Sequence, residues 1–219
     1  MFVLKTFIKN TLINNLAPII KTTSFLELQQ RFAHSKRSIY PKTPDLIYVP
    51  QVLRWIRNKW KFRALKKCWD PDFSEGAFIY GTTRAVCKIT DIINRGQPEE
   101  LENLLTFSAK VKLVDYMKRR LSKVQKEIIT LKPEDIKILV PLNVALVEAG
   151  NKKNCRISMR VLGLKWHEHN GNVLKLVLVA LQTEFLRDYT QRNSEWTISA
   201  FDILECGMLA QIPGQRKPI

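Results

Sequence analysis

A change in hydrophobic period near residue 136 constrains the fold of this chain more than any other feature. Upstream of it, apolar residues recur at spacings of three and four, which is typical of amphipathic helices. Downstream they alternate strictly, which predicts a long strand with one apolar face. The alternating residues are Ile136, Ile138, Val140, Leu142, Val144 and Leu146. Helices followed by a run of strands are typical of α+β domains. We therefore expect N-terminal helices packed on a curved, four-stranded antiparallel sheet.

Three further strands are expected after this one. A turn at 151–154 leads into the second strand, in which alternation runs from Cys155 to Val161 and then shifts phase around Gly163. A phase shift beside a glycine indicates a β-bulge, which bends a strand. His169-Asn170-Gly171 has the composition of a hairpin turn. The third and fourth strands are expected over about 173–189 and 196–204.

Boundary signals divide the helical half of the chain. A helix is expected over 52–69 and is followed by a break at Asp70-Pro71. Asp72 or Ser74 can cap a second helix, which ends at Asn94-Arg95-Gly96. Pro98-Glu99-Glu100 opens a third helix. A fourth helix follows Phe107, with an expected apolar stripe of Val114, Met117, Leu121, Val124 and Ile128.

The first 44 residues have the composition of a mitochondrial presequence. They contain seven Lys or Arg and a single acid, Glu27. A basic, acid-poor and amphipathic start is the signature of such a presequence, although an ordinary amphipathic surface helix remains the alternative. Arg31-Phe32-Ala33 resembles a processing site. The expected apolar face of this segment is formed by Leu4, Ile8, Leu12 and Leu16.

The prolines Pro41, Pro44 and Pro50 indicate an extended linker after the presequence. The expected organisation is a presequence over 1–33, the linker over 34–50, a basic amphipathic helix over 51–70, an α+β binding domain over 71–205 and a C-terminal tail over 206–219.

The charge balance favours anionic partners. Lys and Arg number 36 against 20 Asp and Glu, which gives a formal net charge of +16. Nucleic acid, anionic lipid and acidic protein surfaces all fit such an excess. The four cysteines have no paired short spacing, so we expect reduced thiols rather than a disulfide framework or zinc site. The longest apolar run, Val173 to Leu181, is too short for a membrane span and predicts a buried strand.

No pattern in the sequence assembles catalytic chemistry. His167-Glu168-His169 is the only metal candidate, but a stable site needs a third and fourth ligand. A polar hairpin tip is therefore the interpretation we favour there. Nucleophile-elbow, phosphate-loop and dinucleotide glycine motifs are absent from the sequence. We expect a protein that is not an enzyme and uses no metal or cofactor.

The segment 52–69 carries the sharpest local signal, because aromatic and basic residues are interleaved there without any acid. Such a helix can lie on an anionic membrane, or can bind RNA phosphates and stack on bases. In a third interpretation, its tryptophans pack on their own domain and the basic face is solvated. The candidate membrane or RNA contacts are Arg54, Trp55, Arg57, Lys59, Trp60, Lys61, Arg63, Lys66 and Lys67.

Several short motifs, taken in order, resemble the m-AAA protease-interacting protein family over residues 50–205. Near the start, Trp55-Ile56-Arg57 is followed by Asp72-Phe73-Ser74-Glu75-Gly76-Ala77. Near the end, Glu184-Phe185 and Arg187-Asp188-Tyr189-Thr190 precede Trp196-Thr197-Ile198. The order and spacing of these motifs carry the resemblance.

The resemblance implies a cone-shaped α+β domain with a curved sheet and an apolar concavity, in the mitochondrial matrix at the inner membrane. It implies a non-enzymatic adaptor that binds the m-AAA protease and escorts an imported precursor, the regulator subunit of the calcium uniporter. The same domain occurs in an import-motor subunit of the presequence translocase and in a membrane-proximal protein of the mitoribosomal large subunit. A structural mitoribosomal protein or ribosome receptor is therefore the alternative function, and anionic inner-membrane lipid and the mitochondrial ribosome are further candidate partners.

Overall fold

The computed structural model describes residues 41–169, 173–191 and 194–213 of the chain. These residues fall into two compact units. The described part of the larger unit contains residues 51–163, 178–191 and 194–207, and that of the smaller unit contains residues 41–50, 164–169, 173–177 and 208–213. Residues 41–50 have no regular secondary structure, and residues 34–40 of the expected linker lie outside the described part of the chain. No helix among the described residues is long and apolar enough to cross a membrane.

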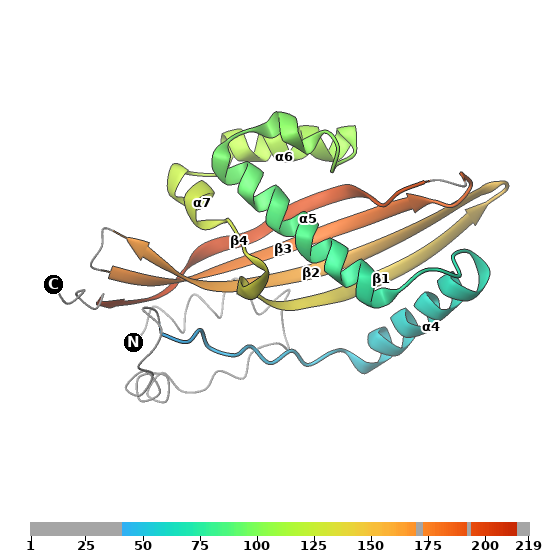
Figure 1. Ribbon diagram of the computed structural model, residues 1–219, viewed down its shortest axis with the longest axis horizontal. Helices are drawn as coiled ribbons and strands as arrows, with labels where there is room; N and C mark the ends of the chain where they lie inside the picture. The colour runs from blue at the N-terminus through green and yellow to red at the C-terminus, as the bar shows by residue number, and fades with distance from the viewer. Residues whose placement is uncertain (1–40, 170–172, 192–193, 214–219) are drawn as a thin grey trace. The chain divides into compact units, whose positions relative to one another are not determined.

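The strands form one four-stranded sheet in the order β1-β2-β3-β4 (Figure 1). All four expected strands are present, and the α+β class predicted from the change in period is confirmed. Strands that follow one another in the sequence are therefore also neighbours in the sheet, and a short connection is enough to join each to the next. The bounds are Ile136–Ala149 for β1, Lys152–His169 for β2, Val173–Asp188 for β3 and Thr197–Pro213 for β4.

The pairing of β1 with β2 corrects two expectations. The turn lies at Gly150 and Asn151, not over 151–154, because Ala149 already pairs with Lys152. Gly150 adopts a positive φ of 58°, which glycine tolerates without strain. The bulge is also placed differently. Ile136 pairs with Gly163 and Ile138 pairs with Leu162, so two steps along β1 match one step along β2. The extra residue therefore belongs to β1 and not to β2.

The fourth strand is longer than its sequence pattern indicated. The alternation ended near Leu204, but β4 continues to Pro213. Much of the expected 206–219 tail is therefore strand, while residues 214–219 lie outside the described part of the chain. Near its start, β4 is joined by a short parallel bridge between Leu105 and Ile198. Thr106 N donates to the Ile198 carbonyl at 2.9 Å, which pairs backbone groups that an edge strand would otherwise expose.

Helices α4 (Val52–Cys68) and α5 (Glu75–Arg95) form where they were expected. Ser74 caps α5 by accepting a hydrogen bond from Ala77 N, and Gly96 ends it in the left-handed conformation. The expected third helix is only a short 3₁₀ turn, η3 (Pro98–Leu101). A second such turn, η4 (Pro133–Asp135), precedes β1.

The expected fourth helix is split into α6 (Phe107–Arg119) and α7 (Lys123–Ile128). Ser122 starts α7 with a capping box, in which Gln125 N donates to the Ser122 hydroxyl and Ser122 N donates to the Gln125 side chain. This local pairing gives the backbone an alternative to a continuous helix. As a result Val124, which belonged to the expected stripe, is 48% exposed.

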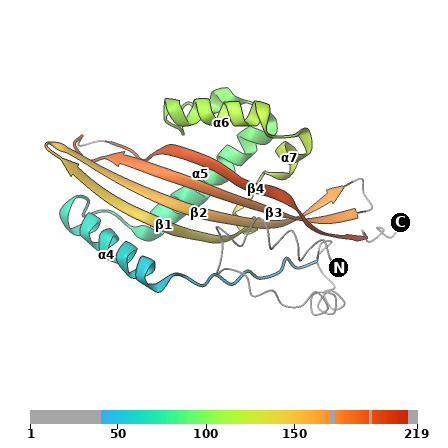
Figure 2. The same ribbon diagram turned by 180° about the vertical axis from the view of Figure 1, so that it is seen from behind.

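Helix α5 crosses one face of the sheet (Figures 1 and 2). Its inward stripe contains Val86, Ile89, Ile92 and Ile93, all with 0% exposure. Each fully buried aliphatic side chain of this size contributes about 1.5–3 kcal/mol. Thr90 lies on the same buried side, and its hydroxyl accepts a hydrogen bond from Leu131 N at 3.1 Å. The segment before β1 is thus tied to the middle of α5.

Candidate functional site

Helix α4 packs on the domain through a narrow stripe that does not include its most exposed tryptophans. Phe62 and Leu65 are 5% and 0% exposed, and Asn58 Nδ2 donates to the Pro141 carbonyl of β1 at 3.0 Å. Trp55 and Trp60 are 51% and 67% exposed. The helix therefore docks on its own domain through Phe62 and Leu65 and not through Trp55 or Trp60, whereas Trp69 directly after it lies against Tyr189, with ring centroids 5.8 Å apart.

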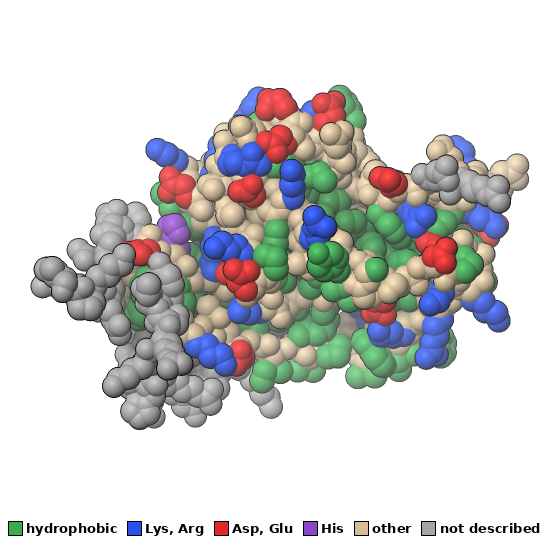
Figure 3. Space-filling view, in the orientation of Figure 1, with side chains coloured by type: hydrophobic (Ala, Val, Ile, Leu, Met, Phe, Trp, Pro, Cys, Tyr) green, Lys and Arg blue, Asp and Glu red, His purple; other side chains and the backbone are tan. Residues whose placement is uncertain are grey.

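The outward side of α4 combines apolar and basic side chains. Leu53 and Trp60 are seven residues apart, so they lie on the same side of the helix, and they are 84% and 67% exposed. Successive residues are about 100° apart around the helix, which places Arg57 and Lys67 within about 40° of Leu53 on either side, while Arg63 is turned toward Lys66 and the first turn of α5. Figure 3 shows Lys and Arg side chains interleaved with hydrophobic ones at the lower right, where α4 runs. We call Leu53, Arg57, Trp60 and Lys67 the outer face of α4.

The nine residues singled out in the sequence all lie on α4, but not on one face. Cations are found on both flanks of the buried stripe, so the amphipathic division expected for 51–70 is incomplete. Lys59 is paired with Glu75, with its Nζ 2.7 Å from Oε2. No ion pair joins the other six cations to any acid among the described residues; they are Arg54, Arg57, Lys61, Arg63, Lys66 and Lys67.

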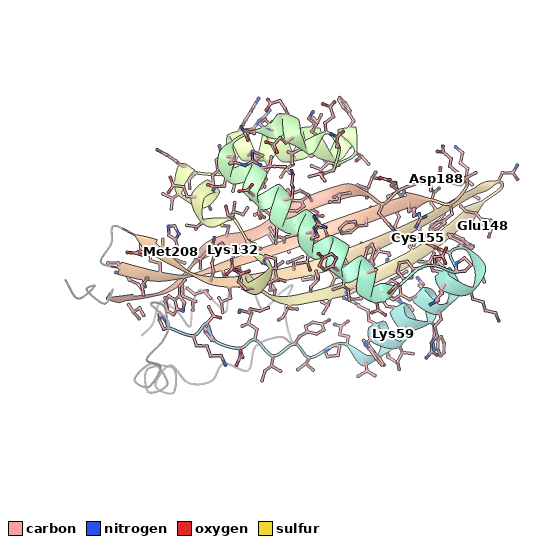
Figure 4. The ribbon with its side chains drawn as sticks, in the orientation of Figure 1. Lys59, Lys132, Glu148, Cys155, Asp188 and Met208 are labelled. Atoms are coloured by element: carbon pink, nitrogen blue, oxygen red, sulfur yellow. The ribbon has the colours of Figure 1, made fainter. Side chains whose placement is uncertain are left out.

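A groove runs between α4 and the first turn of α5, with a volume of about 750 Å³. Phe73 forms part of its lining and is 7% exposed, while Trp55 lines it from α4. Lys59, labelled in Figure 4 on α4, lines the same groove. Arg63 and Lys66 are its other basic residues. We call this groove the α4–α5 groove.

An ion pair and an aromatic cluster hold the corner between α4 and α5 against the strands. Arg187 Nη1 donates to Asp70 Oδ2 at 2.9 Å, and the Tyr189 hydroxyl donates to the same oxygen at 2.8 Å. The Arg187 guanidinium also lies over the Tyr189 ring, 4.7 Å from its centroid. Burial, followed by the hydrogen bond to Asp70, raises the pKa of Tyr189 well above its ordinary value. The Tyr189 phenol is therefore held as a hydrogen-bond donor.

All the motifs that carry the family resemblance except Trp55-Ile56-Arg57 meet at this corner. Phe73 belongs to the motif over 72–77, Phe78 directly follows it, and Trp196 opens the last motif. The Phe78 ring centroid lies 5.0 Å from that of Trp196 and 5.2 Å from that of Phe185. These residues line a second groove of about 500 Å³ together with Asp70 and Arg187. Segments about a hundred residues apart in the sequence thus build one site.

Sequence reasoning missed the role of Asp70. It lies at the break after the first helix and was interpreted only as a turn signal, whereas the structure makes it the acceptor for Arg187 and Tyr189. The signal that pointed toward it was the Arg187-Asp188-Tyr189 motif, because its Arg and Tyr are two residues apart and lie on one side of β3 and its end. The carboxylate partner could not be identified from spacing alone.

Other candidate positions assemble no further site in the described residues. No cluster of three or more His, Cys, Asp or Glu able to hold a metal ion is found in that part of the chain. His167 lies near the end of β2, the side chain of His169 is outside the described set, and so is the hairpin turn that follows. The expected processing residues Arg31, Phe32 and Ala33 also lie outside it.

The thiols are free, as expected from their spacing. Cys155, labelled in Figure 4 on β2, is fully buried, and burial raises its pKa to about 12. Burial likewise raises the pKa of Cys87 to about 11, with Asp135 and Glu134 adding to the effect. Both thiols therefore stay protonated at neutral pH, the form that is not nucleophilic.

A comparison with known protein families and with curated proteins found no match to this chain. The exposed outer face of α4, the α4–α5 groove and the aromatic groove beside Arg187 are the candidate binding surfaces of the described residues.

Proposed function

We propose that the protein is a non-enzymatic adaptor of the mitochondrial matrix that associates peripherally with the inner membrane through the outer face of α4. The observation that carries this proposal is the exposure of Leu53 and Trp60 between cations that have no carboxylate partner among the described residues. An amphipathic surface with aromatic and aliphatic residues inside a basic border suits the headgroup region of an anionic bilayer.

The magnitudes favour reversible association. A Lys or Arg close to an anionic membrane contributes about 1 kcal/mol before screening. Lys59 contributes less than the others, because its ammonium is already paired with the Glu75 carboxylate at 2.7 Å. Arg57 and Lys67 together supply about 2 kcal/mol, to which insertion of Leu53 and Trp60 adds apolar burial. Salt reduces the electrostatic part, since the Debye length is about 8 Å at physiological ionic strength.

The adaptor part of the proposal rests on the family resemblance. All of its motifs except Trp55-Ile56-Arg57 lie at the corner held by Asp70, Arg187 and Trp196, so most residues that carry the resemblance form one connected part of the domain. On that basis the proposed partners are the m-AAA protease and an imported inner-membrane precursor, the uniporter regulator subunit. The proposed location follows from the basic, acid-poor sequence of residues 1–44.

Vesicle flotation tests the membrane contact. The full chain should float with vesicles that contain cardiolipin. With neutral vesicles it should remain at the bottom of the gradient. The double variant Arg57→Glu/Lys67→Glu should lose this difference, because it reverses two exposed charges beside Trp60. The matched control is Arg63→Glu/Lys66→Glu, which changes the net charge equally on the groove side of α4 and should float nearly as well as the unchanged chain.

Equal flotation of the unchanged chain and the outer-face variant with cardiolipin vesicles would remove the membrane contact from the proposal. A ribosome gradient examines the alternative function. If the native protein co-sediments with large ribosomal subunits in high salt, a structural mitoribosomal role replaces the adaptor role.

A further inference from the structure

The α4–α5 groove has the features of a docking site, and its cations are not those of the outer face of α4. Trp55, Phe73 and Arg63 line it and lie outside the outer face of α4, whereas Trp60 borders both surfaces. Trp55 is 51% exposed, so about half of a large aromatic surface borders the groove uncovered. Phe73 is 7% exposed and is stacked on Phe62, with ring centroids 5.6 Å apart. The apolar part of the groove is thus rigidly supported from beneath.

The groove already holds one carboxylate of the chain itself. Both Glu75 oxygens accept hydrogen bonds from Lys59 Nζ, at 2.8 and 2.7 Å. Arg63 and Lys66 line the same groove and have no acidic partner among the described residues. The groove therefore carries two uncompensated positive charges next to an exposed aromatic surface.

From this combination we infer that the α4–α5 groove binds an acidic peptide segment of another protein, with an aromatic or aliphatic side chain against Trp55 and carboxylates on Arg63 and Lys66. Arginine receives carboxylates in a bidentate geometry, and exposed tryptophan with arginine is the typical composition of an interface centre. The ion pair between Lys59 and Glu75 lies beside the proposed position of the peptide's aromatic or aliphatic side chain.

Charge argues against the other occupants. Residues 1–44 contain seven Lys or Arg and one acid, and residues 214–219 contain Arg216 and Lys217 without an acid, so these segments of the chain itself are repelled. A second copy also carries a net charge of +16. A polynucleotide needs a longer basic track with several stacking platforms, whereas this groove has two unpaired cations beside the Glu75 carboxylate.

Fluorescence anisotropy with a labelled probe tests the inference on the full chain. The probe is a short fluorescein-labelled peptide of Asp, Glu, Phe and Leu. One control peptide has Asn and Gln in place of the acids, and another has Ser in place of Phe and Leu. The acidic apolar probe should bind, and each control peptide should bind at least about tenfold more weakly, because it lacks one of the two required interactions.

Two pairs of substitutions with equal charge change locate the binding site. Arg63→Glu/Lys66→Glu should weaken probe binding at least about tenfold, while Arg57→Glu/Lys67→Glu should change it by less than about threefold. Trp55→Ala should weaken it several-fold with no change in charge. All five side chains are solvent-accessible, and unchanged circular dichroism and urea midpoints verify that the variants are folded.

The same two double variants separate this inference from the proposed membrane contact, because each should lose one activity and keep the other. Equal loss of probe binding in both variants would show attraction by net charge alone and overturn the inference. Equal binding of the Asn and Gln peptide would overturn it too. If the groove variant instead loses binding to anionic vesicles or to single-stranded RNA while probe binding persists, the groove belongs to that ligand and the peptide site is refuted.

Discussion

Gly163 is a position where a side chain is restricted by a packing contact that the sequence pattern does not reveal. Its place at a phase shift indicated a bulge on its own strand, but the extra residue lies on β1. The close neighbour of Gly163 is Leu131. A Cβ built at Gly163 would lie 2.4 Å from one Leu131 methyl carbon and 3.0 Å from the other. Leu131 is 2% exposed, so it has little room to move away.

Gly163→Ala should therefore lower the free energy of unfolding by about 1–3 kcal/mol, the usual cost of overpacking a core. Urea denaturation measures the change. Leu131→Ala removes the clashing methyl groups, so the double variant should be less destabilised than the sum of the two single variants. The matched control is Gly81→Ala in α5, where an added Cβ meets nothing within 4 Å.

The control substitution should have the opposite sign. Alanine is favoured over glycine inside a helix by about 1 kcal/mol, so Gly81→Ala should leave the stability unchanged or raise it. If Gly163→Ala proves as harmless as Gly81→Ala, the contact with Leu131 does not restrict this position.

Cys155 provides a residue whose environment was only partly predictable. Its alternating position indicated a buried side chain, and it is fully buried. Its neighbours across the sheet, however, depend on the register of β1 and β3, which the sequence leaves open. Burial raises the pKa of the Cys155 thiol to about 12, because the thiolate would lose its hydration.

The folded state therefore disfavours the thiolate, and stability should decrease once unfolded thiols begin to ionise, near pH 8.5. This contribution is fully present below that pH and is lost as the pH rises toward about 12. Between about pH 8 and 9.5 the loss attributable to Cys155 should be about 1 kcal/mol. Urea denaturation at both pH values measures it, with Cys155→Ala as the control that should show a flatter dependence.

Alkylation supplies an independent measurement. Iodoacetamide should modify the exposed Cys68 in the folded protein and leave the buried Cys155 unmodified until urea is added. Rapid modification of Cys155 at neutral pH in the folded protein would contradict this account of its environment.

At the scale of elements, the sequence was most informative where local chemistry alone decides the structure. The caps of α5 are an example, since Ser74 and Gly96 act as their residue types indicate. The division of α6 from α7 could have been recognised too, because Ser122 and Gln125 have the spacing of a capping box. The apolar spacing continues through the break between the two helices, so periodicity alone predicts one long helix there.

Helix α4 illustrates what remained hidden at this scale. Its composition indicated an interface, but its buried side could not be assigned from composition, because cations and tryptophans occur around the helix. The position of α4 is decided by Phe62, Leu65 and the hydrogen bond from Asn58 to the Pro141 carbonyl. Asn58 would not be chosen as a docking residue from a pattern of hydrophobic residues, since its partner is a backbone atom of another element.

At the scale of the whole molecule, the order of helices and strands was enough to predict the α+β class and the four strands. The ion pair between Asp70 and Arg187 was not predictable, because 117 residues separate its members. The candidate site consequently divides in two. Its basic helix was evident in the sequence, whereas the α4–α5 groove arises only when Phe73 and Glu75 fold back beside α4.

The net charge of +16 leads to a prediction about the protein in its proposed surroundings. If the membrane contact is mainly electrostatic, salt should release the protein from mitochondrial membranes. The Debye length falls from about 10 Å at 0.1 M salt to about 3 Å at 1 M, so the attraction of Arg57 and Lys67 to lipid phosphates is largely screened. Burial of Leu53 and Trp60 is not screened by salt, and release should therefore be graded over this range.

Fractionation of purified mitochondrial membranes at increasing salt, followed by immunoblotting, measures the release. The Arg57→Glu/Lys67→Glu variant should appear in the soluble fraction already at low salt, and Trp60→Ala should shift the release to lower salt while keeping the charge. Retention of the unchanged protein in the membrane pellet at 1 M salt would show that electrostatic attraction to lipid is not what holds it there. If the unchanged protein and the Arg57→Glu/Lys67→Glu variant are released at the same salt concentration, the attachment is made by a surface other than the outer face of α4.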